Sequence, residues 1–157
     1  MNLQELINQK KLEEFKKPIA DIKKVLEKGT QRLAFAKASF NESTPESYFD
    51  SIYTSIYDSV RFTGEAYVLL NGYRAKITDH HKTVINVSRE FMKKEEDMKN
   101  VFTRLNKMRK KRHDLDYDFD TYGASKTSIT QAIKDAEKFT KRVAEAVAKK
   151  DPQQKLR

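Results

Sequence analysis

The sequence of 157 residues contains no cysteine, only four glycines and only three prolines. Without cysteine the chain can form neither a disulfide nor a thiolate site for a metal or for catalysis. Because glycine and proline mark most tight turns, their scarcity favours a few long regular elements. No stretch approaches the roughly 18 consecutive apolar residues of a membrane-spanning helix. The N-terminus also lacks the apolar run of a signal peptide, so we expect a cytoplasmic protein.

Charge is what the sequence has in excess. Charged residues make up 35% of the chain, and the formal net charge is +9. A surplus of this size favours polyanionic partners through a long-range field, although it says nothing about the fold. Nine phenylalanines and seven tyrosines, with the aliphatic residues, can still fill a core. The length suits one domain.

Apolar residues recur at three- and four-residue intervals nearly throughout, which is the period of an α-helix. The clearest stripe predicts a helix that begins after the cap Thr44 and the first-turn proline Pro45 and ends at Asn71-Gly72. Gly64 lies on this stripe and predicts close approach of another helix, because glycine otherwise only weakens a helix. Further helices are expected over about residues 18–40, 79–91, 95–115 and 127–148. Pro18 would lie in the first turn of the helix over 18–40, and Asp79 would cap the helix over 79–91. The cap of the final helix would be Ser128, Ser125 or Thr127.

These helices predict an all-α protein, an antiparallel up-and-down helical bundle of four to five main helices. The bundle is expected over residues 18–150. Residues 1–17 form an N-terminal extension in which a short helix fits the pattern, and residues 151–157 form a flexible tail. We see no strand-type alternation longer than a few residues.

The segment MRKKRHDLDY, residues 108–117, joins a basic run to an acidic one. In the helix expected there, a seven-residue pattern places Arg112 on the row of Leu105, where an apolar side chain would be usual. A charge at such a position needs an anion nearby. Asp116, one turn later, is the structural candidate for that anion, and a phosphate is the functional one. Tyr117 lies about 140° around an ideal helix from Arg112, so the two share a site only if the helix bends or ends, or if two copies meet.

Two other patterns are weaker evidence for a functional site. The acids of DLDYDFD alternate as in a calcium loop, but Phe119 and Ser125 occupy the positions that need glycine and an acid. The adjacent pair His80-His81 cannot face one metal ion from a helix. We therefore expect no metal and no cofactor. Tyr53 and Tyr67 lie on the apolar stripe, which favours core packing over base stacking.

One longer stretch resembles a known family. Residues 65–91, EAYVLLNGYRAKITDHHKTVINVSREF, run through a helix, Leu-Leu, a glycine, a basic loop, His-Lys and an apolar helix. This order resembles the middle of the HEPN superfamily (higher eukaryotes and prokaryotes nucleotide-binding domain). The motif R-x-x-x-D-Y, from Arg112 to Tyr117, is similar to the arginine and Asp-Tyr element of one small prokaryotic branch. The long final helix, Thr127 to Ala148, is in the expected place. The resemblance covers roughly residues 18 to 150.

The resemblance implies a helical bundle, usually a homodimer, in which two copies of the motif Arg112, His113 and Tyr117 line a basic cleft. Many members are metal-independent endoribonucleases, often toxins paired with a small nucleotidyltransferase antitoxin that in some pairs attaches nucleotide to the motif tyrosine. In such an enzyme Arg112 would bind the scissile phosphate, and His113 or Tyr117 would move a proton. The basic residues that would hold the flanking RNA backbone are Arg104, Lys107, Arg109, Lys110 and Lys111.

Two other classes of function fit the same residues. The chain could be a non-catalytic helical module that binds nucleotide or docks a nucleotidyltransferase. It could also be a structural bundle whose basic face is only solvated. Cleavage of RNA in EDTA that depends on Arg112 would indicate the enzyme, whereas nucleotide binding without cleavage would indicate the module. A monomer without affinity for nucleic acid would indicate the structural bundle.

Overall fold

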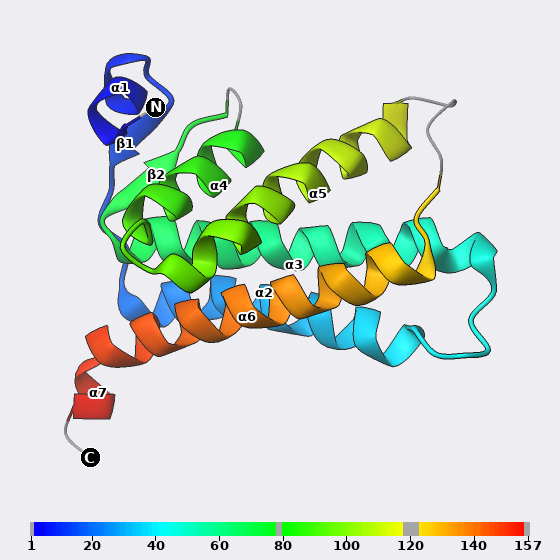
Figure 1. The fold of residues 1–157 in the computed structure, drawn as a ribbon. Helices are drawn as coiled ribbons and strands as arrows, with labels where there is room; N and C mark the ends of the chain where they lie inside the picture. Colours follow the sequence, from blue (N-terminus) through cyan, green and yellow to red (C-terminus); the bar gives the residue numbers. More distant parts are fainter. Residues whose placement is uncertain (1, 78–79, 118–122, 156–157) are drawn as a thin grey trace.

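The computed structural model describes residues 2–77, 80–117 and 123–155, and it confirms the all-α bundle. Helix α3 lies at the centre and contacts each of the other four long helices. Figure 1 shows α2, α3 and α6 side by side, with α4 and α5 adjacent to each other on the opposite side of α3. The long helices are α2 (Ile19–Ser39), α3 (Phe49–Leu70), α4 (His80–Phe91), α5 (Lys99–Tyr117) and α6 (Lys126–Lys150).

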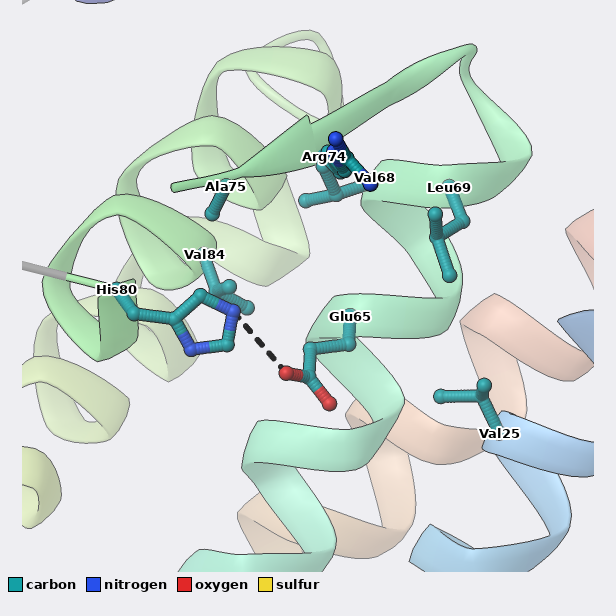
Figure 2. A pocket seen from close by; sticks show the side chains of 8 residues that line it. All are labelled: Val25, Glu65, Val68, Leu69, Arg74, Ala75, His80 and Val84. Atoms are coloured by element: carbon teal, nitrogen blue, oxygen red, sulfur yellow. Dashed lines mark ion pairs between the residues drawn. The ribbon is translucent and has the colours of Figure 1, made fainter. Parts of the chain in front are cut away.

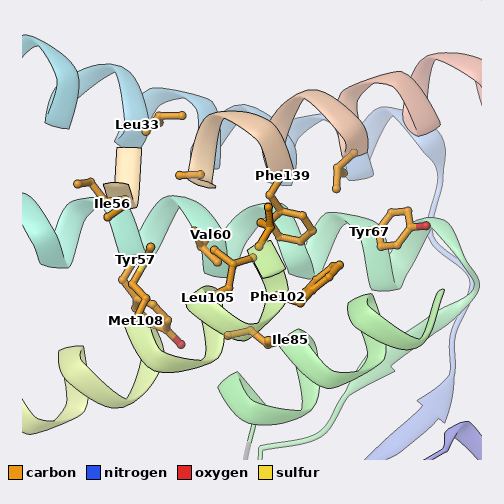
Figure 3. Packing of buried hydrophobic residues seen from close by; sticks show 14 of the residues in the cluster. Leu33, Ile56, Tyr57, Val60, Tyr67, Ile85, Phe102, Leu105, Met108 and Phe139 are labelled. Atoms are coloured by element: carbon orange, nitrogen blue, oxygen red, sulfur yellow. The ribbon is translucent and has the colours of Figure 1, made fainter. Parts of the chain in front are cut away.

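The apolar stripe predicted for α3 faces the core along its whole length. Tyr53 and Tyr67 are at most 9% exposed, so core packing is their role. Gly64 confirms the predicted close approach, because a Cβ there would lie 2.5 Å from Cγ1 of Val84 in α4. Figure 3 shows the centre of this core, where side chains from α3, α5 and α6 interleave. The buried stripe residues of α3 are Phe49, Ile52, Tyr53, Ile56, Val60, Gly64, Tyr67 and Leu70.

The start of α3 differs from the prediction. Thr44 is not its cap: the Thr44 hydroxyl donates to the Ser39 carbonyl at 2.8 Å and accepts the Asn41 N–H at 2.9 Å, which closes the end of α2. A 3-10 turn, η1 (Glu46–Tyr48), comes before Phe49 instead. The predicted end is confirmed, since Asn71 caps the helix and Gly72 has φ of +88°.

Two other helix starts also shift. Helix α5 begins at Lys99 after the 3-10 turn η2 (Glu96–Met98), not at Glu95. Ser125 caps α6: its side chain accepts the Ser128 N–H at 3.1 Å, and the Ser128 hydroxyl accepts the Ser125 N–H at 2.8 Å. Ser125 is therefore the cap among the three candidates. The predicted cap Asp79 and residues 118–122 of the acidic run lie outside the described residues.

The N-terminal segment contains a short helix, which fits the sequence pattern, and a strand that the sequence did not predict. After helix α1 (Leu3–Asn8), strand β1 (Leu12–Glu14) pairs antiparallel with β2 (Tyr73–Ala75), and Leu12 lies opposite Ala75. Strands of three residues are too short to show the alternation by which a strand is recognised. Leu12 is 1% exposed and packs in a small cluster with Val68 of α3. The segment is thereby fixed to the bundle.

The C-terminal residues are also partly fixed. Asp151, expected in a flexible tail, is 2% exposed and forms an ion pair with Lys23 of α2. A short helix, α7 (Pro152–Lys155), follows it. None of the helices in the described part of the chain has the length and apolar character that crossing a lipid bilayer requires.

Candidate functional site

The end of α5 and the start of α4 enclose a basic hollow. The two helices run in opposite directions, so the first turn of α4 lies beside the last turns of α5 (Figure 1). The hollow, here called the first hollow, has a volume of about 320 Å³. Of the described residues that line it, none is acidic. They are Ile77, His80, His81, Lys82, Arg109, Arg112 and His113.

Arg112 is the most constrained cation of the first hollow. Its side chain is 28% exposed, and its Nη1 lies 2.9 Å from Oδ2 of Asp116, one turn later. Its guanidinium carbon lies 6.0 Å from the centre of the Tyr57 ring of α3. Its Nε is buried and has no hydrogen-bond partner among the described residues. The structural anion, Asp116, is thus present, but it leaves one buried donor of Arg112 unsatisfied.

Tyr57 and His81 form the inner part of this region. Tyr57 is 1% exposed, and its hydroxyl has no partner in the described part of the chain. Burial raises the pKa of Tyr57 to about 12. Its ring centre lies 5.7 Å from that of His81. Burial first, and then the positive charges of Arg61, His80 and Arg112, lower the pKa of His81 to about 4. His81 is therefore neutral at pH 7, so it can donate one hydrogen bond and accept another.

The structure brings two of the three predicted catalytic residues to the first hollow. Arg112 and His113 line it, whereas Tyr117 does not. Tyr117 is 71% exposed, and its ring centre lies 4.8 Å from that of His113, one turn earlier. Helix α5 continues to Tyr117 without a break, so helical geometry separates Tyr117 from Arg112 within one copy of the chain.

The predicted backbone-binding residues divide into two groups. Arg104 is bound within the bundle: its Nε and Nη2 donate to the buried carboxylate of Asp135 on α6 at 2.9 and 3.0 Å. This hydrogen bonding raises the pKa of Arg104. Lys111 is half-buried and lines neither hollow of this face. The other three, Lys107, Arg109 and Lys110, line a second hollow of about 300 Å³ together with Thr103, Asn106 and Arg89 of α4.

Sequence reasoning missed the contribution of α4 to this face. His80 and His81 were weighed only as metal ligands, and Lys82 and Arg89 were not singled out. The signal that could have found them is the short connection between α4 and α5, which makes the two helices antiparallel neighbours.

His80 also borders a separate, mainly apolar pocket of about 240 Å³. There its Nε2 lies 3.1 Å from a carboxylate oxygen of Glu65, as Figure 2 shows. The imidazole of His80 thus points toward Glu65 of α3, which makes it a weaker candidate than Lys82 for binding an anion in the first hollow.

Comparison with known proteins identifies the family. A family model described as HEPN domain matches residues 22–147, which is most of the chain and includes both helices of the basic face. Neither the curated proteins nor the solved structures gave a match. HEPN membership indicates a nuclease or another RNA-related function in general. The chain belongs to the HEPN superfamily.

Proposed function

We propose that this protein is an RNA-binding homodimer that cleaves RNA without a metal ion, in the manner of a toxin–antitoxin endoribonuclease, with the scissile phosphate in the first hollow. One observation carries the proposal: Arg112, whose side chain is 28% exposed, lines a hollow that has no acid among its described lining residues. A phosphate in this hollow would accept a charge-assisted hydrogen bond from the guanidinium.

Asp116 has a defined part in this proposal. By holding Nη1 of Arg112 at 2.9 Å, it would fix the guanidinium at the edge of the hollow. The guanidinium carbon also lies 6.0 Å from the centre of the Tyr57 ring. A donor fixed before substrate binds stabilises developing charge better than one that must reorient. Arg112 would therefore stabilise the extra negative charge on the phosphate as it is attacked.

The reaction that fits is attack by the ribose 2′-hydroxyl on the adjacent phosphorus. The new bond joins the 2′-oxygen to phosphorus, the bond from phosphorus to the 5′-oxygen breaks, and the products are a 2′,3′-cyclic phosphate and a 5′-hydroxyl. One group must accept the proton of the 2′-hydroxyl, and another must protonate the leaving oxygen. His113 lies at the hollow and is the nearer candidate for one of these transfers.

Tyr117 would take the other transfer from a second copy of the chain. Within one copy Tyr117 lies on another side of α5 from Arg112. Its 71% exposure leaves its ring available to a partner. Two copies that meet along the ends of α5 would place Tyr117 of each near the first hollow of the other.

The test is incubation of the purified protein with total RNA in EDTA. Arg112→Met keeps an unbranched aliphatic side chain and removes the guanidinium, so we expect cleavage to fall by about 100-fold or more. Tyr117→Phe and His113→Gln remove one proton-transfer group each. Lys24→Met, on the exposed face of α2, is the matched control and should cut normally. Undiminished cleavage by Arg112→Met, with an unchanged melting temperature, would refute the assignment of Arg112.

A second candidate function is a non-catalytic module that binds nucleotide or docks a small nucleotidyltransferase. The exposed pair of rings, His113 and Tyr117, favours it, because two adjacent rings at a helix end can contact a base or an incoming nucleotide. Titration with nucleoside triphosphates would support the module if binding depends on Tyr117 and no RNA is cut. In cells, growth arrest that Arg112→Met relieves would instead support the toxin.

A further inference from the structure

Three hollows follow one another between α4 and α5. Arg109 lines both the first and the second hollow. Arg89 and Thr103 line both the second hollow and a third one of about 370 Å³, which extends to Lys93 and Lys99. Because neighbouring hollows share lining residues, they lie one after another along the two helices, and this row of hollows is here called the α4–α5 groove. Figure 1 shows the two helices adjacent along this length.

Five cations of the first two hollows have no carboxylate partner in the described part of the chain, whereas Arg112 pairs with Asp116, and Lys93 and Lys99 of the third hollow pair with Glu90 and Glu96. Among the described residues, no carboxylate lies within ion-pair distance of Lys82, Arg89, Lys107, Arg109 or Lys110. Nε of Arg109 instead donates to Oδ1 of Asn106 at 3.2 Å. Several cations elsewhere do pair with acids, namely Arg104 with Asp135, Arg142 with Glu95 and Asp97, Lys37 with Glu137, and Arg74 with Glu13.

We propose that the α4–α5 groove binds the backbone of a single-stranded RNA whose scissile phosphate lies at Arg112. This inference rests on the proposed function, which supplies RNA as the ligand. The polyanion that fits a row of unpaired cations leading away from a phosphate site is the strand that carries that phosphate. Arg89 of α4 and Lys107 of α5 would bind the RNA backbone from the two sides of the second hollow.

The dimensions of the groove favour a single strand over a duplex. Packed helices have axes about 8–10 Å apart, so a depression between two neighbours has room for one backbone. Double-stranded RNA is recognised across a much broader surface, over two successive minor grooves. From Arg112 back to Lys99 the helix rises about 20 Å, which corresponds to a site on the order of four nucleotides, a small site for a single-strand binder.

The test compares charge reversal in the groove with charge reversal on the far side of the bundle. Arg89→Glu and Lys107→Glu change exposed side chains of the second hollow and should leave the melting temperature unchanged. The control is Lys24→Glu on α2, which packs against α3 and α6. Binding is measured by fluorescence anisotropy with a 2′-O-methyl oligouridine of about ten nucleotides, which lacks the attacking hydroxyl.

We expect the double variant Arg89→Glu/Lys107→Glu to bind the oligomer at least about tenfold more weakly than the Lys24→Glu control. Loss of two phosphate contacts should also reduce the slope of log affinity against log salt by about 1.4. The KM for a longer RNA should rise more than the KM for a dinucleotide, because a dinucleotide reaches only the first hollow.

The outcomes separate this inference from the proposed function. If the protein cleaves dinucleotides, and the groove variants lose no more affinity for the oligomer than the control does, the groove assignment is refuted and the proposed function stands. A duplex that binds as tightly as the single strand, with the same loss in the variants, overturns the single-strand assignment. Failure to bind or cleave any RNA overturns both.

Discussion

The ion pair between Arg104 and Asp135 gives the sharpest stability prediction. It joins α5 to α6 through two hydrogen bonds, of 2.9 and 3.0 Å. Its two sides are unequal, because the Asp135 side chain is 4% exposed and the Arg104 side chain is 41% exposed. Arg104→Met would leave a buried carboxylate with only the amide of Gln131, at 3.2 Å. Asp135→Asn would leave a guanidinium that water can reach. We therefore expect Arg104→Met to be the more destabilising change.

The magnitudes follow from that asymmetry. Removing one partner of a fully buried ion pair costs about 3–5 kcal/mol. Because the head of Arg104 is partly exposed and Gln131 remains, we expect about 2 kcal/mol for Arg104→Met. Asp135→Asn keeps a neutral acceptor, so its cost should be about 1 kcal/mol, that of an ordinary hydrogen bond. The double variant Arg104→Met/Asp135→Leu buries no lone charge and should cost less than Arg104→Met alone.

Urea unfolding of the three variants measures these differences, and RNA affinity supplies a second readout. Since the guanidinium of Arg104 is already bound by Asp135, Arg104→Met should retain the affinity of the Lys24→Met control for RNA, whereas Arg109→Gln should lose affinity. A cost for Asp135→Asn that equals or exceeds that of Arg104→Met would contradict the reasoning about burial. A loss of RNA affinity in Arg104→Met as large as in Arg109→Gln would show that Arg104 contacts the ligand after all.

Three further predictions concern stability. The pKa of His81 is about 4 in the folded chain and near 6.5 when unfolded, so acid favours the unfolded state. The free energy of unfolding should therefore fall as the pH drops from about 6.5 toward about 4, by on the order of 1–2 kcal/mol after allowance for solvent screening. In urea titrations, His81→Phe should remove this pH-dependent loss of stability. Gly64→Ala should cost about 1–3 kcal/mol, because Val84 lies 2.5 Å from the new Cβ, and adding Val84→Ala should cost less than the sum of the two changes. Lys23 lowers the pKa of Asp151, so Asp151→Asn should lower the melting temperature at neutral pH, and the difference should shrink as acid protonates the wild-type carboxyl.

The long helices could be predicted because each has a continuous apolar face. The stripe of α3 gave its end at Asn71-Gly72 and its close contact at Gly64. The start of α3 could not be located in the same way, because Thr44 and Pro45 fit a helix start as well as the loop that closes α2. The pairing of β1 with β2 joins segments about sixty residues apart, and the local sequence of Leu12–Glu14 does not predict a strand.

The candidate site was predicted only on the helix that carries the motif. Arg112 was found because it interrupts an apolar row, and the structure places it half-buried against Tyr57. The sequence predicts Arg104 as a backbone contact, whereas the structure pairs it with Asp135, and a signal for this pair existed: Asp135 lies on the apolar stripe of α6, beside Ala136, and a buried acid there needs a cation. His81 and Arg89 line the hollows only because α4 packs on α5. The helical periodicity of one segment does not specify which helix packs beside it.

In the proposed enzyme, the same geometry would require two copies of the motif. Within one chain Asp116 satisfies Nη1 of Arg112, and the unbroken helix turns Tyr117 away from it. Asp116 would therefore fix the proposed phosphate-binding group, and the second proton-transfer group would have to come from elsewhere. A second copy that approaches along the ends of α5 would bring its Tyr117 to the first hollow and leave the α4–α5 groove open on each copy. A dimer of this kind would hold two strands, one on each copy, and each strand would end between Arg112 of one copy and Tyr117 of the other.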